Sequence, residues 1–192
     1  REIIYKKRKE VLESENIKND IIVLLEKEIA SIVYTHTQPQ ETKDWNYREI
    51  AETVQTIHRD PAVAFTIDDI TGMHDREEMI ERIKDYFFKE YQEREKMVTE
   101  PEILRKIEKS IYLHIIDTLW MEHIDNLSSL RESVSLKGYG QRDPLLEYKQ
   151  EAYTTFEKLL SSIQTHTVNT LFKVDIKRHV PAEVLASDRP DT

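Results

Sequence analysis

Two of the three glycines in this chain flank a single tyrosine, in the run Gly138-Tyr139-Gly140. Long stretches with apolar residues at helical spacing come before and after this run. Glycine adopts positive φ without steric penalty, so the tripeptide lets two helices turn back sharply on each other. The sequence therefore predicts a helical hairpin that presents Tyr139 at its tip.

Apolar spacing and capping signals predict an all-α chain without strands or internal repeats. We expect helices over residues 1–13, 17–36, 75–98, 101–136 and 144–172, a helix capped by Asn46, and a short one opened by Asp60-Pro61. Thr99, Asp75 and Asp143 are further predicted N-caps, with Pro144 at the first helical position after Asp143. The apolar stripe of the longest helix is predicted at Ile107, Ile111, Ile115, Leu119, Leu127, Leu130 and Val134. The inner face of the last helix is predicted at Ala152, Phe156, Leu159, Leu160 and Ile163.

Composition and missing motifs exclude several classes of function. The chain has 192 residues, a net charge of -9 and no cysteine, which argues against nucleic-acid binding, disulfides and thiolate zinc sites. The chain has glycines only at 72, 138 and 140, so it contains neither a phosphate-binding loop nor a dinucleotide-binding fingerprint. None of the seven histidines has a glutamate three residues before it, which excludes the ligand pattern of di-iron helical bundles. No apolar run approaches the length of a membrane span. We therefore expect no catalytic site, metal or cofactor in this chain itself.

A few aromatic and basic residues remain as candidates. Trp120 is predicted to be a core residue that joins the hairpin to another helix, and His114 and His123 are expected at the margin of the core with ordinary hydrogen bonds. Tyr139 has two interpretations: a ring that folds back on its own helices, or a displayed contact. Basic residues exceed acidic ones around the turn, which favours a functional tip: Arg131, Lys137, Arg142 and Lys149 against Glu132, Asp143 and Glu147.

Residues 117–160 carry a resemblance to a known family. The segment is similar to the two-helix finger of the SecA family of bacterial preprotein translocase ATPases. The matching positions are Asp117, Leu119, Trp120, His123, Leu130, Arg131, Gly138, Tyr139, Gln141, Asp143, Pro144, Glu147, Tyr148 and Phe156. Gly140 stands where the family often has alanine, so the tip is expected to be more flexible. Tyr5 and Arg8 resemble the end of the family's scaffold helix.

The resemblance implies an organisation for the whole chain. It implies the end of a long scaffold helix at 1–13, a helical wing at 14–103, scaffold and two-helix finger at 104–178, and a flexible tail at 179–192. The expected fold is a long antiparallel hairpin packed on a scaffold helix, with a smaller, irregular wing lobe. Because the chain begins within a helical pattern and without a cap, we expect a piece of a longer protein that lacks the motor domains.

The resemblance also implies a role. In the parent protein, ATP and Mg²⁺ bound to the motor domains would drive unfolded preprotein through the SecY channel, at an anionic membrane surface on the cytoplasmic face of the bacterial inner membrane. The implied contacts to substrate are Tyr139, Gly138, Gly140, Lys137 and Arg142; the structural residues are Trp120, His123, Asp143 and Pro144. The alternative is a soluble helical adaptor that binds a partner helix without a mechanical role.

Overall fold

The computed structural model describes residues 1–38, 41–57, 64–98, 100–137 and 143–175, and the side chains of 135–137 are not described. These residues form six α-helices and two single 3₁₀ turns, with no strand among them, which confirms the all-α prediction. The α-helices are α1 (Glu2–Glu13), α2 (Lys18–His36), α3 (Tyr47–Ile57), α4 (Arg76–Lys96), α5 (Pro101–Lys137) and α6 (Pro144–Lys173). The 3₁₀ turns are η1 (Thr42–Asp44) and η2 (Ile67–Asp69).

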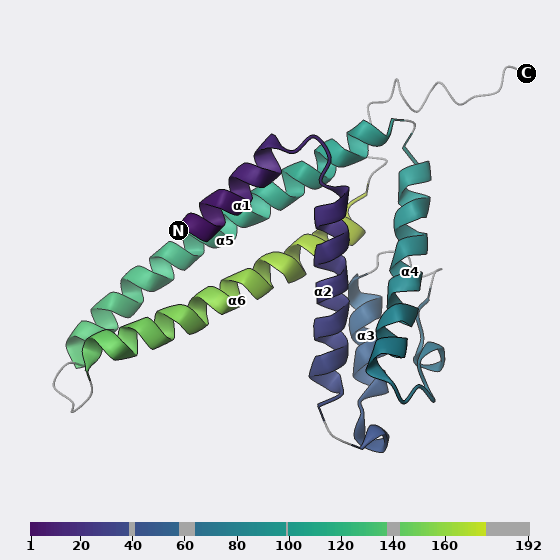
Figure 1. Ribbon diagram of the computed structural model, residues 1–192, viewed down its shortest axis with the longest axis horizontal. Coiled ribbons are helices and arrows are strands. Elements are labelled where there is room, and N and C mark those ends of the chain that lie inside the picture. The colour runs from purple at the N-terminus through teal and green to yellow at the C-terminus, as the bar shows by residue number, and fades with distance from the viewer. Residues whose placement is uncertain (39–40, 58–63, 99, 138–142, 176–192) are drawn as a thin grey trace, which may run out of the picture.

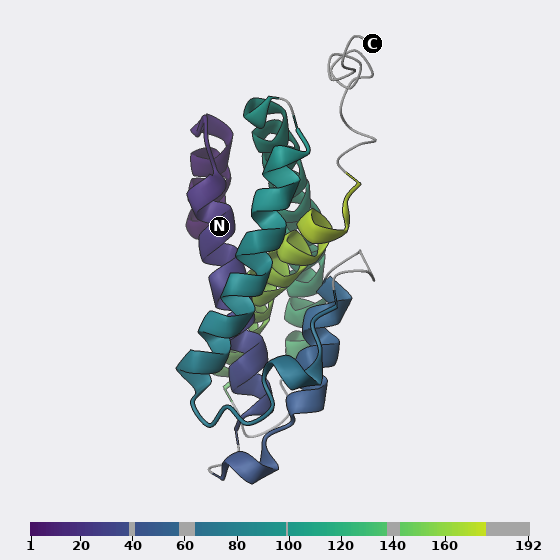
Figure 2. The ribbon, with the colours of Figure 1, turned by 90° about the vertical axis from the view of Figure 1, so that its right-hand side faces the viewer.

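The two longest helices form the expected hairpin. Helices α5 and α6 pack on each other where α5 ends and α6 begins and spread apart away from that point, and α1 lies along α5 (Figure 1). Helices α2, α3 and α4 stand side by side at the other end of the molecule, away from the end of α5 (Figures 1 and 2). Helix α6 reaches this group and contacts both α2 and α3.

Local capping chemistry explains where several helices begin. Asn46 Oδ1 accepts a hydrogen bond from Glu49 N at 3.2 Å, and Asp75 Oδ1 accepts one from Glu77 N at 2.9 Å. Such side chains satisfy amide groups that the first turn of a helix leaves without partners. The predicted helix at Asp60-Pro61 and the cap at Thr99 fall outside the described residues. The segment after Thr66 contains the turn η2.

One hydrophobic core runs through all six helices. It joins α1 and α2 to α5 and α6, and Phe87 of α4 packs edge to face on Phe172 of α6 with ring centroids 5.0 Å apart. The predicted inner face of α6 is wrong at Leu160, which is 42% exposed, whereas Leu159 and Ile163 are buried. Leu160 lines a cavity that opens between α1, α2, α5 and α6.

The buried face of α5 differs from the predicted stripe. Ile115 and Val134 are buried as predicted, but so are Tyr112, Ile116 and Trp120, while Ile111 and Leu119 of the predicted stripe are only partly buried. The reason is that α5 has partners on two sides, since it packs on both α1 and α6. The buried face is therefore wider than one stripe and is centred about one position later along the helix.

Candidate functional site

The candidate site is the finger, residues 117–160, and its attachment to the other helices. Helix α5 ends at Lys137 and α6 begins at Pro144, so the chain doubles back as expected. Asp143 caps α6 by accepting a hydrogen bond from Leu145 N at 2.9 Å, and Pro144 is the first helical residue. The candidate contacts Gly138, Tyr139, Gly140 and Arg142 lie outside the described residues, as does the side chain of Lys137.

The finger is attached to α1 by one ion pair and one aromatic pair. Arg8 Nε and Nη2 donate to the two carboxylate oxygens of Asp117, at 2.7 and 3.0 Å. This two-point geometry restricts the orientation of both side chains, and the carboxylate raises the pKa of Arg8. Tyr5 packs edge to face on Trp120 with ring centroids 6.0 Å apart. Trp120 is buried and joins α5 to α1, as the sequence predicts.

His123 lies between the two helices of the finger. Its ring stacks on Trp120 of α5 and faces Phe156 of α6, with centroids 5.5 and 5.9 Å away. It is buried rather than at the core margin, whereas His114 is exposed, so the expectation for both histidines needs correction. The described residues provide no hydrogen bond to the His123 ring. Burial lowers the pKa of His123 because the charged form loses its hydration.

We expect His123 to make the stability of the finger depend on pH. Its folded pKa lies below the unfolded value, so its contribution is complete above about pH 6.5 and is lost as pH falls through the folded pKa. The free energy of unfolding should fall by up to about 1.4 kcal/mol per pH unit in that window. Urea unfolding between pH 7.5 and 5 should show this fall reduced in His123→Phe and kept in His114→Gln. Equal pH dependence in all three proteins would refute the prediction.

A groove of about 440 Å³ opens between the two helices of the finger. Its walls include Trp120, His123 and Phe156 near α1 and Leu127, Arg131 and Tyr148 nearer the tip. On the outer side, Leu146, Tyr153 and Leu160 are exposed and follow each other at intervals of seven residues, so they share one face of α6. The finger thus carries an apolar stripe on its outside and a mixed aromatic and basic groove within.

A group of polar side chains joins α2, α4 and α5, and we call it the junction network: Lys18, Tyr91, Glu95, Arg105 and Glu108. Tyr91, Arg105 and Glu108 are buried, and Lys18 and Glu95 are partly exposed. Tyr91 donates its hydroxyl proton to Glu108 at 2.7 Å, Arg105 Nη1 donates to Glu108 at 2.6 Å, and Arg105 also bonds Tyr91 and Glu95. Lys18 Nζ donates to both oxygens of Glu95 at 2.8 Å. Burial raises the pKa of Glu108 despite the nearby guanidinium.

Two further contacts attach α6 to the helices before α5. Arg94 at the end of α4 donates to the carbonyl oxygens of Leu171, Phe172 and Val174, which are acceptors at the C-terminus of α6. On α2, the buried carboxylate of Glu28 accepts hydrogen bonds from Gln164 Nε2 at 2.8 Å and Thr165 Oγ1 at 2.9 Å. The hairpin is therefore held in two places: by α1 at Asp117, where the finger begins, and by α2 and α4 along the C-terminal part of α6.

The sequence interpretation missed the junction network, Arg94 and Glu28. A signal was available for Glu108, because it lies four residues after Leu104 and four before Tyr112, on the face of α5 that is buried. A carboxylate at such a position predicts a buried partner. Arg105 precedes Glu108 by three residues, which places both side chains on one face of the helix.

Together, the fold and the finger define a helical scaffold domain that carries a projecting two-helix hairpin. The chain belongs to the SecA family, since the family model "SecA Wing and Scaffold domain" matches residues 1–175. It is 35% identical over 189 residues to the protein translocase subunit SecA of Clostridium novyi (strain NT), which covers 98% of this chain and 22% of that protein. It is 33% identical over 177 residues to the same subunit of Aquifex aeolicus (strain VF5), with 92% and 17% covered.

These matches confirm the resemblance found in the sequence. The chain spans about a fifth of the length of these relatives. The boundaries 1–13, 14–103, 104–178 and 179–192 stay a prediction. The shared core shows that α1 packs with the helices that follow it. Among the described residues, no helix is long and apolar enough to cross a membrane, and no group of three potential metal ligands is found.

Proposed function

We propose that this chain is the part of a SecA motor that turns movement of the motor domains into movement of an unfolded preprotein. In this proposal the finger tip contacts the preprotein at the SecY channel. The observation that carries the proposal is the anchored hairpin: two long helices that pack on each other and are held by α1, α2 and α4. Membership of the SecA family supports it independently.

The way in which the hairpin is attached would allow it to act as a lever. A helix transmits displacement along its axis because its backbone hydrogen bonds run in that direction. Arg8 and Asp117 connect α1 to α5 at the start of the finger, so displacement of α1 is passed to the finger through a two-point ion pair and the Tyr5–Trp120 contact. Arg94 and Glu28 hold the far end of α6 against α4 and α2.

Tyrosine at the tip suits contact with many different sequences. A phenol ring packs on apolar groups and cations, and its hydroxyl exchanges hydrogen bonds with any peptide backbone. Such contacts are individually weak, so a passing chain is gripped and released. Lys137 and Arg142 are proposed to contact acidic stretches of substrate or channel loops. The exposed stripe of Leu146, Tyr153 and Leu160 offers further sequence-tolerant apolar contact along the finger.

The remaining partners follow from the same proposal. ATP and Mg²⁺ are the cofactors of the motor domains, which are partners of this chain, together with the SecY complex, the preprotein and an anionic membrane surface. The proposed location is the cytoplasmic face of the bacterial inner membrane, where the protein is peripheral. Nucleic acid is not a proposed partner, because the net charge of -9 repels a phosphate backbone.

Replacement of the tip tyrosine tests the proposal. In the full-length translocase, Tyr139→Ala should slow preprotein transport by about tenfold, the loss expected for one aromatic contact of about 1.4 kcal/mol, and should leave ATP hydrolysis near its normal rate. Tyr139→Phe keeps the ring and should retain most transport. Tyr34→Ala removes a half-exposed tyrosine of α2 and is the matched control. Normal transport by Tyr139→Ala would count against a gripping role.

A further inference from the structure

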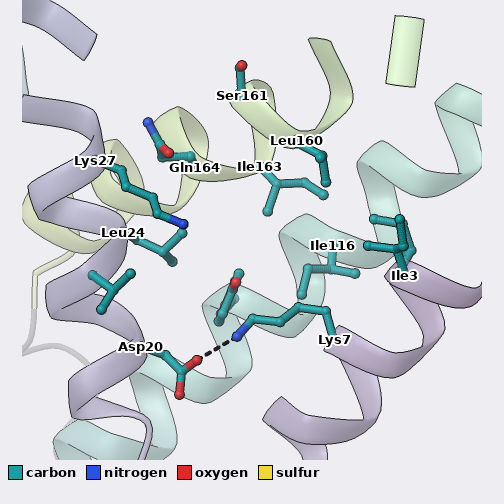
Figure 3. A pocket seen from close by; sticks show the side chains of 13 residues that line it. Ile3, Lys7, Asp20, Leu24, Lys27, Ile116, Leu160, Ser161, Ile163 and Gln164 are labelled. Atoms are coloured by element: carbon teal, nitrogen blue, oxygen red, sulfur yellow. Dashed lines mark hydrogen bonds and ion pairs between the residues drawn. The ribbon is translucent and has the colours of Figure 1, made fainter. Parts of the chain in front are cut away.

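The cavity between α1, α2, α5 and α6 is separate from the groove of the finger, with which it shares no lining residue. Its volume is about 340 Å³, within the range of small-molecule sites. Apolar side chains from all four helices form its walls, among them Ile3, Leu24, Ile116 and Leu160 (Figure 3). Ile3, Val23 and Leu160 are exposed although all three line the cavity, so this apolar site is open to the surface.

The hydroxyl of Tyr112 is a buried polar group at this cavity. Tyr112 lines the cavity and is only 2% exposed, yet the described part of the chain gives its hydroxyl no hydrogen-bond partner. Burial raises the pKa of Tyr112, and so do the negative charges of Asp20 and Glu10, so the phenol keeps its proton at neutral pH. Buried polar groups are nearly always hydrogen-bonded, so the phenol calls for a partner at the cavity.

The charges beside the cavity balance each other. Lys7 Nζ lies 2.6 Å from Asp20 Oδ1 and 4.0 Å from Glu10 Oε2, and Lys27 is a second cation that lines the cavity (Figure 3). A ligand anion would be repelled by the two carboxylates that face Tyr112, and a ligand cation by the two ammonium groups. An ion would also lose its hydration between the apolar walls. The cavity therefore favours a neutral ligand.

We propose that this cavity binds a small neutral amphiphile with an alkyl body and one hydroxyl group. The alkyl body lies against the apolar walls, and the ligand hydroxyl exchanges a hydrogen bond with Tyr112. A hydroxyl both donates and accepts, so it can bond the phenol in either direction while Asp20 and Glu10 attract the phenol proton. Because the walls come from four helices, the ligand stabilises the packing of α1 and α2 on the hairpin. Binding here involves neither the finger tip nor a translocating chain, so its failure leaves the proposed function untouched.

Titration with octan-1-ol tests the proposal on the 192-residue chain. We expect saturable binding by calorimetry, with amide chemical-shift changes centred on the parts of α1, α2, α5 and α6 that line the cavity. Octanoate and octylammonium carry a charge of either sign on an alkyl chain of the same length, and each should bind about tenfold more weakly, because its charge must be desolvated. No saturable octan-1-ol binding overturns the proposal, and either ion binding as tightly as octan-1-ol overturns the assignment of a neutral ligand.

Three variants assign the contacts. Tyr112→Phe keeps the ring and removes only the hydroxyl, and should weaken octan-1-ol binding about fivefold, the loss expected for one hydrogen bond. Tyr153→Phe makes the same change at an exposed tyrosine of α6 that does not line the cavity, and should have no effect. Val23→Trp places a large ring at the cavity wall and should abolish binding. Wild-type affinity in either Tyr112→Phe or Val23→Trp would show that octan-1-ol does not bind as proposed and would overturn the proposal.

Discussion

Replacing Arg105 by Met is expected to lower the free energy of unfolding by about 3–5 kcal/mol, the usual loss when one partner of a buried ion pair is removed. Methionine keeps most of the apolar stem of arginine but not its charge. The carboxylate of Glu108 is then left buried with the hydroxyl of Tyr91, and Glu95 keeps Lys18. The junction network connects α2, α4 and α5, so the whole core should lose stability.

The pH dependence and a double variant sharpen this prediction. Burial already raises the pKa of Glu108, and loss of Arg105 raises it further, so the destabilisation should be smaller at pH 5 than at pH 7.5, because the carboxyl group then takes up a proton. The double variant Arg105→Met/Glu108→Gln removes both charges of the buried pair. It should recover at least half of the stability that Arg105→Met loses. Arg48→Ala, on an exposed arginine, is the control and should change stability by less than about 0.5 kcal/mol. Urea unfolding measures all four proteins. A loss below about 1 kcal/mol in Arg105→Met would mean that the guanidinium does not compensate the buried carboxylate of Glu108.

Trp120→Ala is expected to have the second largest effect, a loss of about 3–5 kcal/mol, because it removes a buried ring from the contact between α5 and α1. The effect should be local as well as global. Tyr5 and His123 lose their aromatic partner, and Arg8–Asp117, which is partly exposed, is left as the main polar contact between the two helices. Helix α1 should therefore detach from α5 and unfold locally more often than the other helices do.

Hydrogen exchange distinguishes this outcome from general destabilisation. In Trp120→Ala, amides of residues 2–13 should exchange faster by a larger factor than those of α2. Trp120→Phe keeps an aromatic contact and should lose about half as much stability. Met121→Ala changes the neighbouring residue, whose side chain is 67% exposed, and should be close to neutral. Equal acceleration in α1 and α2 would mean that Trp120 does not hold α1 in place.

The parts of the fold that depend on local chemistry could be predicted from the sequence. Asn46, Asp75 and Asp143 cap helices where their spacing indicates, and the run around Gly138 connects two packed helices. These features depend on a few neighbouring residues and on backbone amides that must find partners. The resemblance of residues 117–160 to the SecA finger could also be found from the sequence, because it depends on matching residues in a fixed order within one segment.

The parts that depend on long-range packing could not be predicted. Leu160 fits the inner face of α6 by periodicity, yet it is 42% exposed, because it lines the open cavity between α1, α2, α5 and α6. Tyr112 is buried because α1 covers a second side of α5, and no spacing within α5 reveals a partner about 100 residues earlier in the chain. The spacing of Glu108 within α5 indicates that it is buried, but no local pattern identifies Tyr91 of α4 as its partner.

The central claim is that the finger presents Tyr139 to whichever polypeptide is being moved. Site-specific photo-cross-linking from position 139 of the full-length translocase, stalled in turn on two unrelated preproteins, tests it most directly. We predict that the cross-linked partner changes with the preprotein supplied. The same fixed partner in both experiments, and no adduct to either preprotein, would contradict the claim and would favour the helical adaptor.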